Sequence, residues 1–442
     1  MTKKYLLITA FFLIYNSLLA QEDSTRTIEL ANVVISENRM QTPFSELARN
    51  IHLVTRETIE TTPAQSINEL LSYVPGVDIR QRGPAGVQGD LRIRGGTFEQ
   101  VLVLINGVKV SDPQTGHHLL NLPLDRNNIE RIEVLKGPGA RVYGQNAFAG
   151  AINIITKVPE KRLVNASVYG GDFGTWGGNV GVSLPGERYG QYLSVAHDRS
   201  DGYRPNSDYQ MTNFFYQSYA QTDLGTFNFL GGHTMRDFGA SGFYVENSEE
   251  YEETRTSLIS ASLDTKVGEW KVQPRLYWRR NHDNYLFIRS NPGAFNNVHT
   301  THVGGAEVNA TRLNTIGLTG VGVEYRRELI DSDNFSGGTQ QAALGNWQRS
   351  IFGAFLEHRF YFFDRLDVTP GLYLNWYSDF GWNYFPGLDA SYDITNEWKL
   401  YGNLGRSFRI PTYTDLYYNG PSNVGNDQLQ PERAWTYEAG IK

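Results

Sequence analysis

Two adjacent histidines, His117 and His118, are the residues best suited to metal chemistry, because neutral imidazole binds iron and other transition metals. The chain contains nine histidines and no cysteine, which excludes thiolate ligands, a cysteine nucleophile and disulfides. It has no HExxH pair and no GxxxxGK[ST] phosphate-binding loop. No nucleophile has a suitably spaced partner either. We therefore expect no catalytic site and predict that the protein is not an enzyme.

A second candidate site is the stretch HDRSDGYRPNSDYQ at 197–210. Its aspartates Asp198, Asp201 and Asp208 supply the oxygen ligands that calcium prefers. The same pattern also suits a solvated loop, which we favour. Calcium therefore remains a candidate ion, and we predict no other cofactor.

Composition narrows the class of protein. The net charge of −7 and the lack of a basic run argue against a nucleic-acid partner. A single long apolar run, from Tyr5 to Leu19, lies between Lys4 and a polar junction after Ala20. This pattern predicts a secretory signal peptide at 1–20, with an uncleaved anchor as the alternative. One such run also excludes a membrane protein with several helices.

Residues 40–157 have the pattern of a small α+β domain. Helical spacing runs from Glu57 to Tyr73 in two pieces, and we expect Pro63 to start the second. Strand-like runs follow at 91–94, 101–106, 129–135 and 151–156, with glycine and proline between them. Residues 21–39 form a polar leader before this domain.

From residue 162 onward, apolar and polar residues alternate with a period of two. In the stretch 270–280, for example, Trp270, Val272 and Trp278 share one face. We count about 14 such segments of about 10–14 residues, longer than the roughly 5–6 residues usual in globular sheets. Tight turns alternate with long polar connections at 198–208, 236–254, 283–300 and 331–347, as in outer-membrane barrels.

These patterns predict a mainly β fold, in which a small α+β domain precedes an antiparallel transmembrane β-barrel at 158–442. A closed barrel pairs every backbone amide within lipid. A soluble sandwich or propeller is the alternative, but no blade-length repeat supports it. Barrels that hold a domain in their lumen have about 22 strands. We therefore expect that about eight strands are missing from the gene model or are supplied by a second chain.

Several motifs resemble the TonB-dependent receptors in the outer membrane of Gram-negative bacteria. Residues 40–157 resemble their plug domain, through LLSYVPGVDIRQRG (70–83), LRIRGG (91–96), VLVLINGVKV (101–110) and IERIEVLKGPGARVYGQNAFAGAINIITK (129–157). The segments GRSFRIPTYTDLYYNG (405–420) and GNDQLQPERAWTYEAGIK (425–442) resemble the mid-barrel signature of the family. The resemblance implies a plug inside a lipid-embedded barrel.

The resemblance also assigns roles to two sets of residues. The plug motif comprises Arg92, Arg94, Gly95, Gly96, Asn106, Gly107, Glu130, Arg131, Glu133, Lys136, Gly137, Pro138, Tyr143 and Gly144. The mid-barrel motif comprises Phe408, Arg409, Pro411, Asn426, Leu429, Pro431 and Glu432. We expect the charged plug residues to hold the plug through hydrated ion pairs, each worth roughly 0–1 kcal/mol. Asn106 stands where the family usually has aspartate, which weakens the expectation of an ion pair at that turn.

The leader run Asn32-Val33-Val34-Ile35-Ser36 resembles the TonB box. An extended, β-prone segment before a folded domain can be captured by strand addition to a partner. The resemblance implies that this partner is TonB, which with its inner-membrane complex transmits energy to the plug.

The implied function is TonB-dependent active import of a scarce metal-chelate ligand, either siderophore-iron or cobalamin. We expect the outward tips of the plug at 82–88 and 111–119, so the candidate ligand-binding residues are Arg82, Gln114, His117 and His118. A haem receptor is an alternative, although such receptors usually carry a histidine within the mid-barrel signature and 411–426 contains none. An outer-membrane hydrolase or a passive porin would be a different class of barrel.

Overall fold

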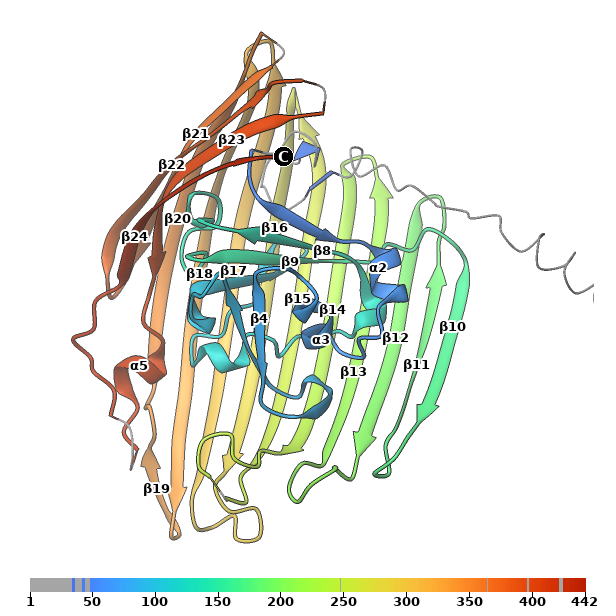
Figure 1. Cartoon of the computed structure of the whole chain (residues 1–442), viewed down its shortest axis with the longest axis vertical. Helices are drawn as coiled ribbons and strands as arrows, with labels where there is room; N and C mark the ends of the chain where they lie inside the picture. The colour runs from blue at the N-terminus through green and yellow to red at the C-terminus, as the bar shows by residue number, and fades with distance from the viewer. Residues whose placement is uncertain are drawn as a thin grey trace, which may run out of the picture.

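The computed structural model of the chain shows a large curved β-sheet with a smaller domain on its concave side (Figure 1). The structure describes residues 34–35, 42–43 and 48–442, apart from 247, 364, 396 and 421–423. The predicted signal peptide at 1–20 lies outside the described residues, as does the leader at 21–39 except for 34–35. Within the described part, β1 (Val34–Ile35) pairs antiparallel with β2 (Thr42–Pro43).

The small domain, which we call the plug, is built on a five-stranded sheet of order β3-β8-β9-β6-β7. These strands are β3 (Ile51–Val54), β6 (Val101–Ile105), β7 (Val108–Lys109), β8 (Ile129–Lys136) and β9 (Gly150–Thr156). β6 and β9 are parallel, and the other neighbouring pairs are antiparallel. Buried valine, leucine and isoleucine side chains of this sheet form the plug core. The strands predicted in this region are confirmed, with ends that differ by one or two residues.

Short helices and turns complete the plug. α2 (Arg56–Thr61) and α3 (Ile67–Ser72) start after Thr55 and Ser66, whose side chains accept hydrogen bonds from backbone amides of the first turn. The prediction that Pro63 starts the second helix is wrong, because Ser66 caps it. Among the described residues, no helix is long and apolar enough to span a membrane. The remaining plug elements are β4 (Val77–Gln81), η3 (Pro84–Gly86), β5 (Gly89–Ile93), η4 (Phe98–Gln100), η5 (Gly116–His118), η6 (Arg126–Asn128) and α4 (Ala140–Tyr143).

The large sheet, which we call the wall, is an antiparallel meander in which each strand of the path pairs with the next. Residues 157–162 connect β9 of the plug to the first wall strand, and α5 (Tyr413–Tyr417) precedes the last. The prediction of about 14 wall strands is confirmed. The strands are β10 (Leu163–Gly170), β11 (Trp176–Leu184), β12 (Tyr189–Ser200), β13 (Tyr209–Thr222), β14 (Gly225–Gly239), β15 (Tyr251–Val267), β16 (Trp270–Leu286), β17 (Asn296–Asn314), β18 (Gly317–Ser336), β20 (Trp347–Phe362), β21 (Leu366–Tyr377), β22 (Gly381–Asp393), β23 (Lys399–Arg409) and β24 (Glu432–Ile441), with β19 (Thr339–Ala342) beside β18.

β10 and β11 are shorter than predicted, with 8 and 9 residues. Several other wall strands are longer, up to 19 residues in β17 and 20 in β18. The extra length comes from stretches that we predicted to be long connections. For example, β14 continues to Gly239 and β16 continues to Leu286. Polar residues at these strand ends remain paired with their neighbours, so polarity alone did not mark the ends of the strands.

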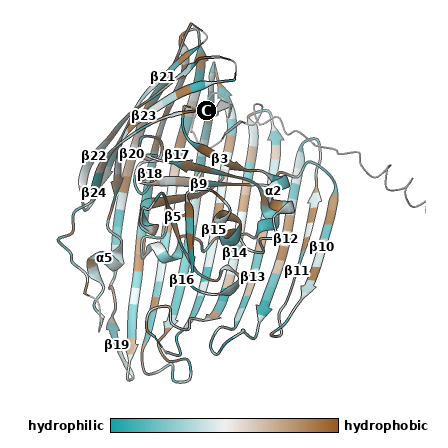
Figure 2. Ribbon diagram, viewed as in Figure 1, coloured by the Kyte–Doolittle hydropathy of each residue, from teal (hydrophilic) through white to brown (hydrophobic). Residues whose placement is uncertain are grey.

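Side-chain polarity in the wall is the reverse of that in a soluble protein. On β18, Val323 and Tyr325 are 47% and 46% exposed, whereas Glu324 between them is only 4% exposed. Figure 2 shows the same alternation along neighbouring strands. An apolar outer face and a polar inner face are typical of a wall that separates lipid from a lumen. This polarity contradicts the alternative of a soluble sandwich or propeller.

The plug packs directly against the inner face of the wall. Ile132 of the plug belongs to the same buried apolar cluster as Phe215 and Leu230 of the wall. At Gly232 on β14, an added Cβ would lie 2.2 Å from the carbonyl oxygen of Pro123 in the plug. The absence of a side chain therefore allows the two backbones to approach this closely.

Gly232→Ala is expected to lower the free energy of unfolding by about 1–3 kcal/mol, because the new methyl group must displace the plug backbone. Gly231→Ala is the matched control, since its Cβ would meet its nearest neighbour, an atom of Phe229, at an ordinary contact distance of 3.5 Å. Thermal unfolding of the purified proteins in detergent measures the difference. Equal stability of the two variants would contradict this seating of the plug.

Candidate functional site

The plug motif forms tight turns at the ends of plug strands. Asn106 and Gly107 connect β6 to β7 with φ values of 49° and 81°. Asn106 donates a hydrogen bond to Thr156 Oγ1 at 2.7 Å and accepts one from the Thr156 amide at 3.0 Å. Neutral hydrogen bonds therefore hold this turn. Other motif positions lie at the end of β5 (Arg92, Arg94, Gly95 and Gly96) and around α4 (Gly137, Pro138, Tyr143 and Gly144).

The charged residues of the plug motif differ in what they contact. Arg94 Nη2 reaches the wall and lies 2.8 Å from Glu438 Oε1 on β24. Arg131 and Glu133 pair with each other on β8 at 2.8 Å. On the same strand Glu130 is exposed, whereas Lys136 at its end is buried. The charged residues of the motif thus form ion pairs within the plug as well as between the plug and the wall.

Other ion pairs between plug and wall are buried. The prediction of hydrated pairs fits Arg94, whose side chain is 39% exposed, and is wrong for these pairs. Lys109 Nζ lies 2.6 Å from Glu324 Oε1 on β18. Asp112 Oδ2 lies 2.7 Å from Arg279 Nη1 on β16. All four side chains are almost completely buried. The two charges of a buried pair replace each other's lost hydration, so the loss of one partner leaves an uncompensated charge.

Arg141 on α4 joins the plug to two wall strands. Its Nη1 lies 2.6 Å from Glu357 Oε2 on β20, and its Nη2 lies 2.5 Å from Asp389 Oδ2 on β22. Arg49 of the plug reaches the same oxygen of Asp389 at 2.6 Å. Sequence reasoning did not identify Arg141 as a wall contact.

The mid-barrel motif also contacts the plug. Arg409, at the end of β23, pairs with Glu99 of the plug and lies 2.8 Å from Asp415 Oδ2 and 3.2 Å from Glu432 Oε1. Phe408 joins a buried aromatic cluster that includes Ala140 of α4. The other motif positions, Pro411, Asn426, Leu429 and Pro431, lie in the segment between β23 and β24.

Two of the candidate ligand-binding residues meet at Asp90 on β5. Arg82 Nη2 lies 3.0 Å from Asp90 Oδ2, and His117 Nδ1 lies 2.7 Å from Asp90 Oδ1. Tyr244, from the connection between β14 and β15, places its ring centroid 5.4 Å from Arg82 Cζ and 6.0 Å from the His117 ring. We call these four residues the Asp90 cluster.

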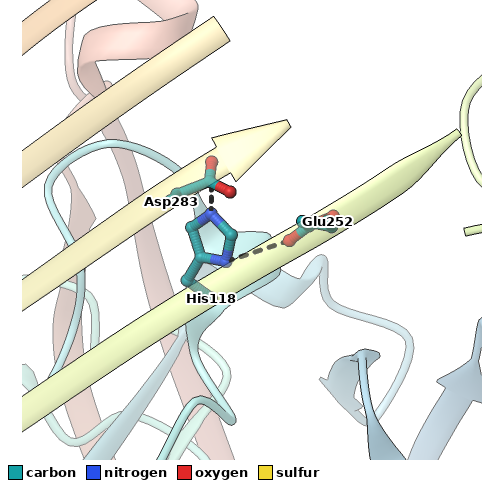
Figure 3. Close-up of side chains that lie close together, drawn as sticks. All are labelled: His118, Glu252 and Asp283. Carbon is teal, nitrogen blue, oxygen red and sulfur yellow. Dashed lines mark hydrogen bonds and ion pairs between the residues drawn. The ribbon is translucent and has the colours of Figure 1, made fainter. Parts of the chain in front are cut away.

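The other two candidates meet at the wall (Figure 3). His118 lies between two carboxylates, with Nε2 3.2 Å from Asp283 Oδ2 and Nδ1 4.0 Å from Glu252 Oε1. Gln114 Nε2 donates to the same Asp283 oxygen at 2.9 Å. We call these four residues the His118 cluster. The expectation of an exposed polar tip is wrong for His118, because the inner faces of β15 and β16 bury it.

Sequence reasoning missed the wall members of both clusters. Glu252 and Asp283 are single polar residues among many that alternate along β15 and β16, and Tyr244 lies in a polar connection. Their only sequence signal is proximity to the long connections. That signal did not distinguish them from neighbouring polar residues.

The clusters shift the pKa values of their plug residues. Burial disfavours the charged form of His118, but the nearby carboxylates of Asp283 and Glu252 outweigh burial and raise the pKa of His118 to about 9. Burial likewise disfavours the Asp90 carboxylate, yet His117 and Arg82 hold the pKa of Asp90 below its ordinary value.

Asp90→Asn is expected to destabilise the plug by about 1.5–3 kcal/mol at neutral pH, because a neutral amide weakens the three hydrogen bonds that Arg82 and His117 make to the carboxylate. A carboxyl group whose pKa is lowered on folding stabilises above its unfolded pKa of about 3.9. That contribution disappears as the pH falls through the lowered value. Unfolding of both proteins between neutral and acidic pH should therefore give stability curves that converge at low pH. A constant difference would contradict the prediction.

The three aspartates of the candidate calcium site each contact a different residue. Asp198 accepts a hydrogen bond from Tyr169 OH at 2.5 Å. Asp201 pairs with Arg199, and Asp208 pairs with Arg289. The structure does not bring the three together, and calcium binding remains a prediction. In the part of the chain that the structure describes, the group with metal-ligand spacing is instead His118, Glu252 and Asp283.

Comparison with known families agrees with this architecture. Residues 43–151 match the TonB-dependent receptor plug domain, and residues 192–442 match the TonB-dependent receptor-like β-barrel. The chain belongs to the TonB-dependent receptors. Proteins of this family are outer-membrane barrels of Gram-negative bacteria, so the apolar outer face of the wall lies in the outer membrane.

Relatives of this receptor transport different ligands. The chain is 28% identical over 436 residues to the vitamin B12 transporter BtuB of Vibrio vulnificus, covering 92% of this chain and 67% of that protein. The chain thus spans about two thirds of that relative. Two solved structures share the fold: the ferric citrate transporter FecA (TM-score 0.76, 18% identity, 92% of this chain and 70% of FecA) and the siderophore receptor PirA of Pseudomonas aeruginosa (TM-score 0.70, 21% identity, 88% and 71%).

Proposed function

We propose that this receptor imports a scarce metal-chelate ligand, cobalamin or a ferric siderophore, across the outer membrane. The observation that carries the proposal is a plug seated against the inner face of the wall by buried ion pairs and apolar contacts. A plugged lumen opposes free diffusion, so passage of a ligand requires rearrangement of the plug. This argues against a passive porin.

TonB supplies the energy for that rearrangement in this proposal, through the leader residues 32–36. Val34 and Ile35 of this run are in extended backbone and pair with 42–43. A segment that already forms strand ladders is suited to strand addition with a periplasmic partner. Its position before β3 connects the point of capture directly to the plug sheet.

In this proposal the Asp90 cluster contacts the ligand. The side chains of Arg82 and His117 are 17% and 20% exposed, whereas His118 is only 3% exposed. The cluster lies on the side of the plug that faces the connection between β14 and β15. Tyr244 adds an aromatic ring to one cationic and one imidazole group there. Cobalamin is the first ligand to test, because relatives that are 28% and 27% identical are vitamin B12 transporters.

Direct measurement of binding and uptake tests the function. We expect purified receptor to bind cyanocobalamin or ferric citrate in isothermal titration calorimetry, and cells that express it to accumulate the same ligand when the proton-motive force is intact. Uptake that persists after the force is collapsed, together with leakage of small solutes through receptor-containing vesicles, would instead establish a passive pore.

A further inference from the structure

The His118 cluster has the composition of a metal site rather than of an ordinary plug-to-wall contact. Its ligand-type atoms come from η5 of the plug and from neighbouring wall strands, where Glu252 and Asp283 occupy nearby positions on the inner face. One nitrogen and two carboxylate oxygens lie within 4.8 Å of one another. Metal–ligand bonds of about 2.0–2.2 Å place ligand atoms roughly 3–4 Å apart, so these side chains must move closer together to share one cation. Asp283 faces Nε2 and Glu252 faces Nδ1, so one carboxylate must also turn toward the other ring nitrogen.

Unpartnered oxygens in the same cluster point independently to a cation site. Glu252 Oε1, Asp283 Oδ1 and Gln114 Oε1 are buried and accept no hydrogen bond within the described residues. Their residues are 2%, 4% and 4% exposed. A buried acceptor without a donor is unfavourable, and more so when it is charged. The separation of 4.0 Å between His118 Nδ1 and Glu252 Oε1 is too long for a hydrogen bond between them.

The nearest arginines do not neutralise these oxygens. Arg82 pairs with Asp90, and Arg279 pairs with Asp112. Arg236 directs its guanidinium to backbone carbonyls of the plug and to Asn121 Oδ1. A dication would balance both carboxylates, whereas a protonated imidazole carries only one positive charge.

We propose that His118, Glu252 and Asp283 bind a resident divalent transition-metal cation of the zinc class, which fastens η5 of the plug to β15 and β16. Imidazole with carboxylate oxygens suits zinc better than calcium, which prefers oxygen ligands throughout. The amide oxygen of Gln114, Oε1, lies in the same cluster and could act as a further oxygen ligand to the metal. The cation belongs to the receptor itself, so its role is distinct from that of the imported ligand.

Titration of metal-free receptor with Zn²⁺ alone tests this site. We expect isothermal titration calorimetry of the full chain in detergent to show one high-affinity Zn²⁺ per chain, and His118→Ala to weaken binding about 100-fold or more. X-ray absorption of the loaded protein should show one imidazole nitrogen and carboxylate oxygens at about 2.0–2.2 Å. His302→Ala on β17 is the control, because His302 contacts Trp278 outside the cluster.

A second variant keeps the test valid if His118→Ala does not fold. Glu252→Gln preserves shape and is expected to weaken Zn²⁺ binding by at least about 10-fold. Wild-type protein that takes up no Zn²⁺ at millimolar concentration would overturn the proposal, as would equal affinity in wild type and His118→Ala. No chelate ligand is present in this titration, so failure here leaves the transport proposal standing.

Discussion

Deletion of residues 32–36 is expected to abolish ligand uptake while leaving ligand binding unchanged. These residues precede the plug, and their proposed role is capture by TonB through strand addition. The candidate ligand-contact residues Arg82 and His117 lie far along the chain, in the plug near the wall connections. Uptake of labelled cobalamin or ferric citrate by whole cells, with binding measured on the purified receptor, separates the two effects.

A deletion of equal length at 24–28 is the control, because it shortens the same leader without touching the predicted TonB box. This variant should transport normally. If deletion of 32–36 also removed ligand binding, the segment would be part of the plug's structure rather than a point of energy coupling. Normal uptake after deletion of 32–36 would refute the role directly.

Arg141→Ala is expected to lower the free energy of unfolding by about 3–5 kcal/mol, the usual cost of removing one partner from a buried ion pair. The arginine side chain is 3% exposed and holds carboxylates on β20 and β22. Its removal leaves Glu357 uncompensated and Asp389 with Arg49 alone. Chemical unfolding in detergent and limited proteolysis of the plug both report the loss.

Arg199→Ala provides the matched control, since Arg199 pairs with Asp201 in an exposed position and its side chain is 44% exposed. Exposed pairs contribute about 0–1 kcal/mol, so this variant should be close to wild type. Comparable destabilisation by the two variants would mean that the plug is held by its apolar contacts and that the buried charges add little.

The sequence predicted the architecture because both regions have strong local patterns. Period-two alternation, as at Trp270, Val272 and Trp278, revealed the wall, and the plug strands followed from short apolar runs. Strand ends were less predictable, because polar residues such as those before Gly239 stay paired beyond the apolar part of the wall. A cap by Ser66, rather than Pro63, similarly depends on local geometry that several residues could supply.

The candidate site was only half predictable. Two histidines, an arginine and a glutamine of the plug stood out near expected turns, but Asp90 did not. Their wall partners did not, because contacts such as His118 with Asp283 join residues 165 positions apart and depend on register and strand tilt. The prediction of hydrated ion pairs failed for the buried pairs for the same reason, since the position of the plug against the wall decides how far each pair is exposed to water.

The six residues between Thr156 and Leu163 form a short covalent tether between the plug and the wall. Fully extended, this stretch reaches about 20–22 Å at roughly 3.3–3.6 Å per residue. The apolar band of an outer-membrane barrel is itself about 25 Å tall. The end of β9 can therefore move only a short distance from the start of β10, so any rearrangement that admits a ligand has to leave this end of the plug near the wall.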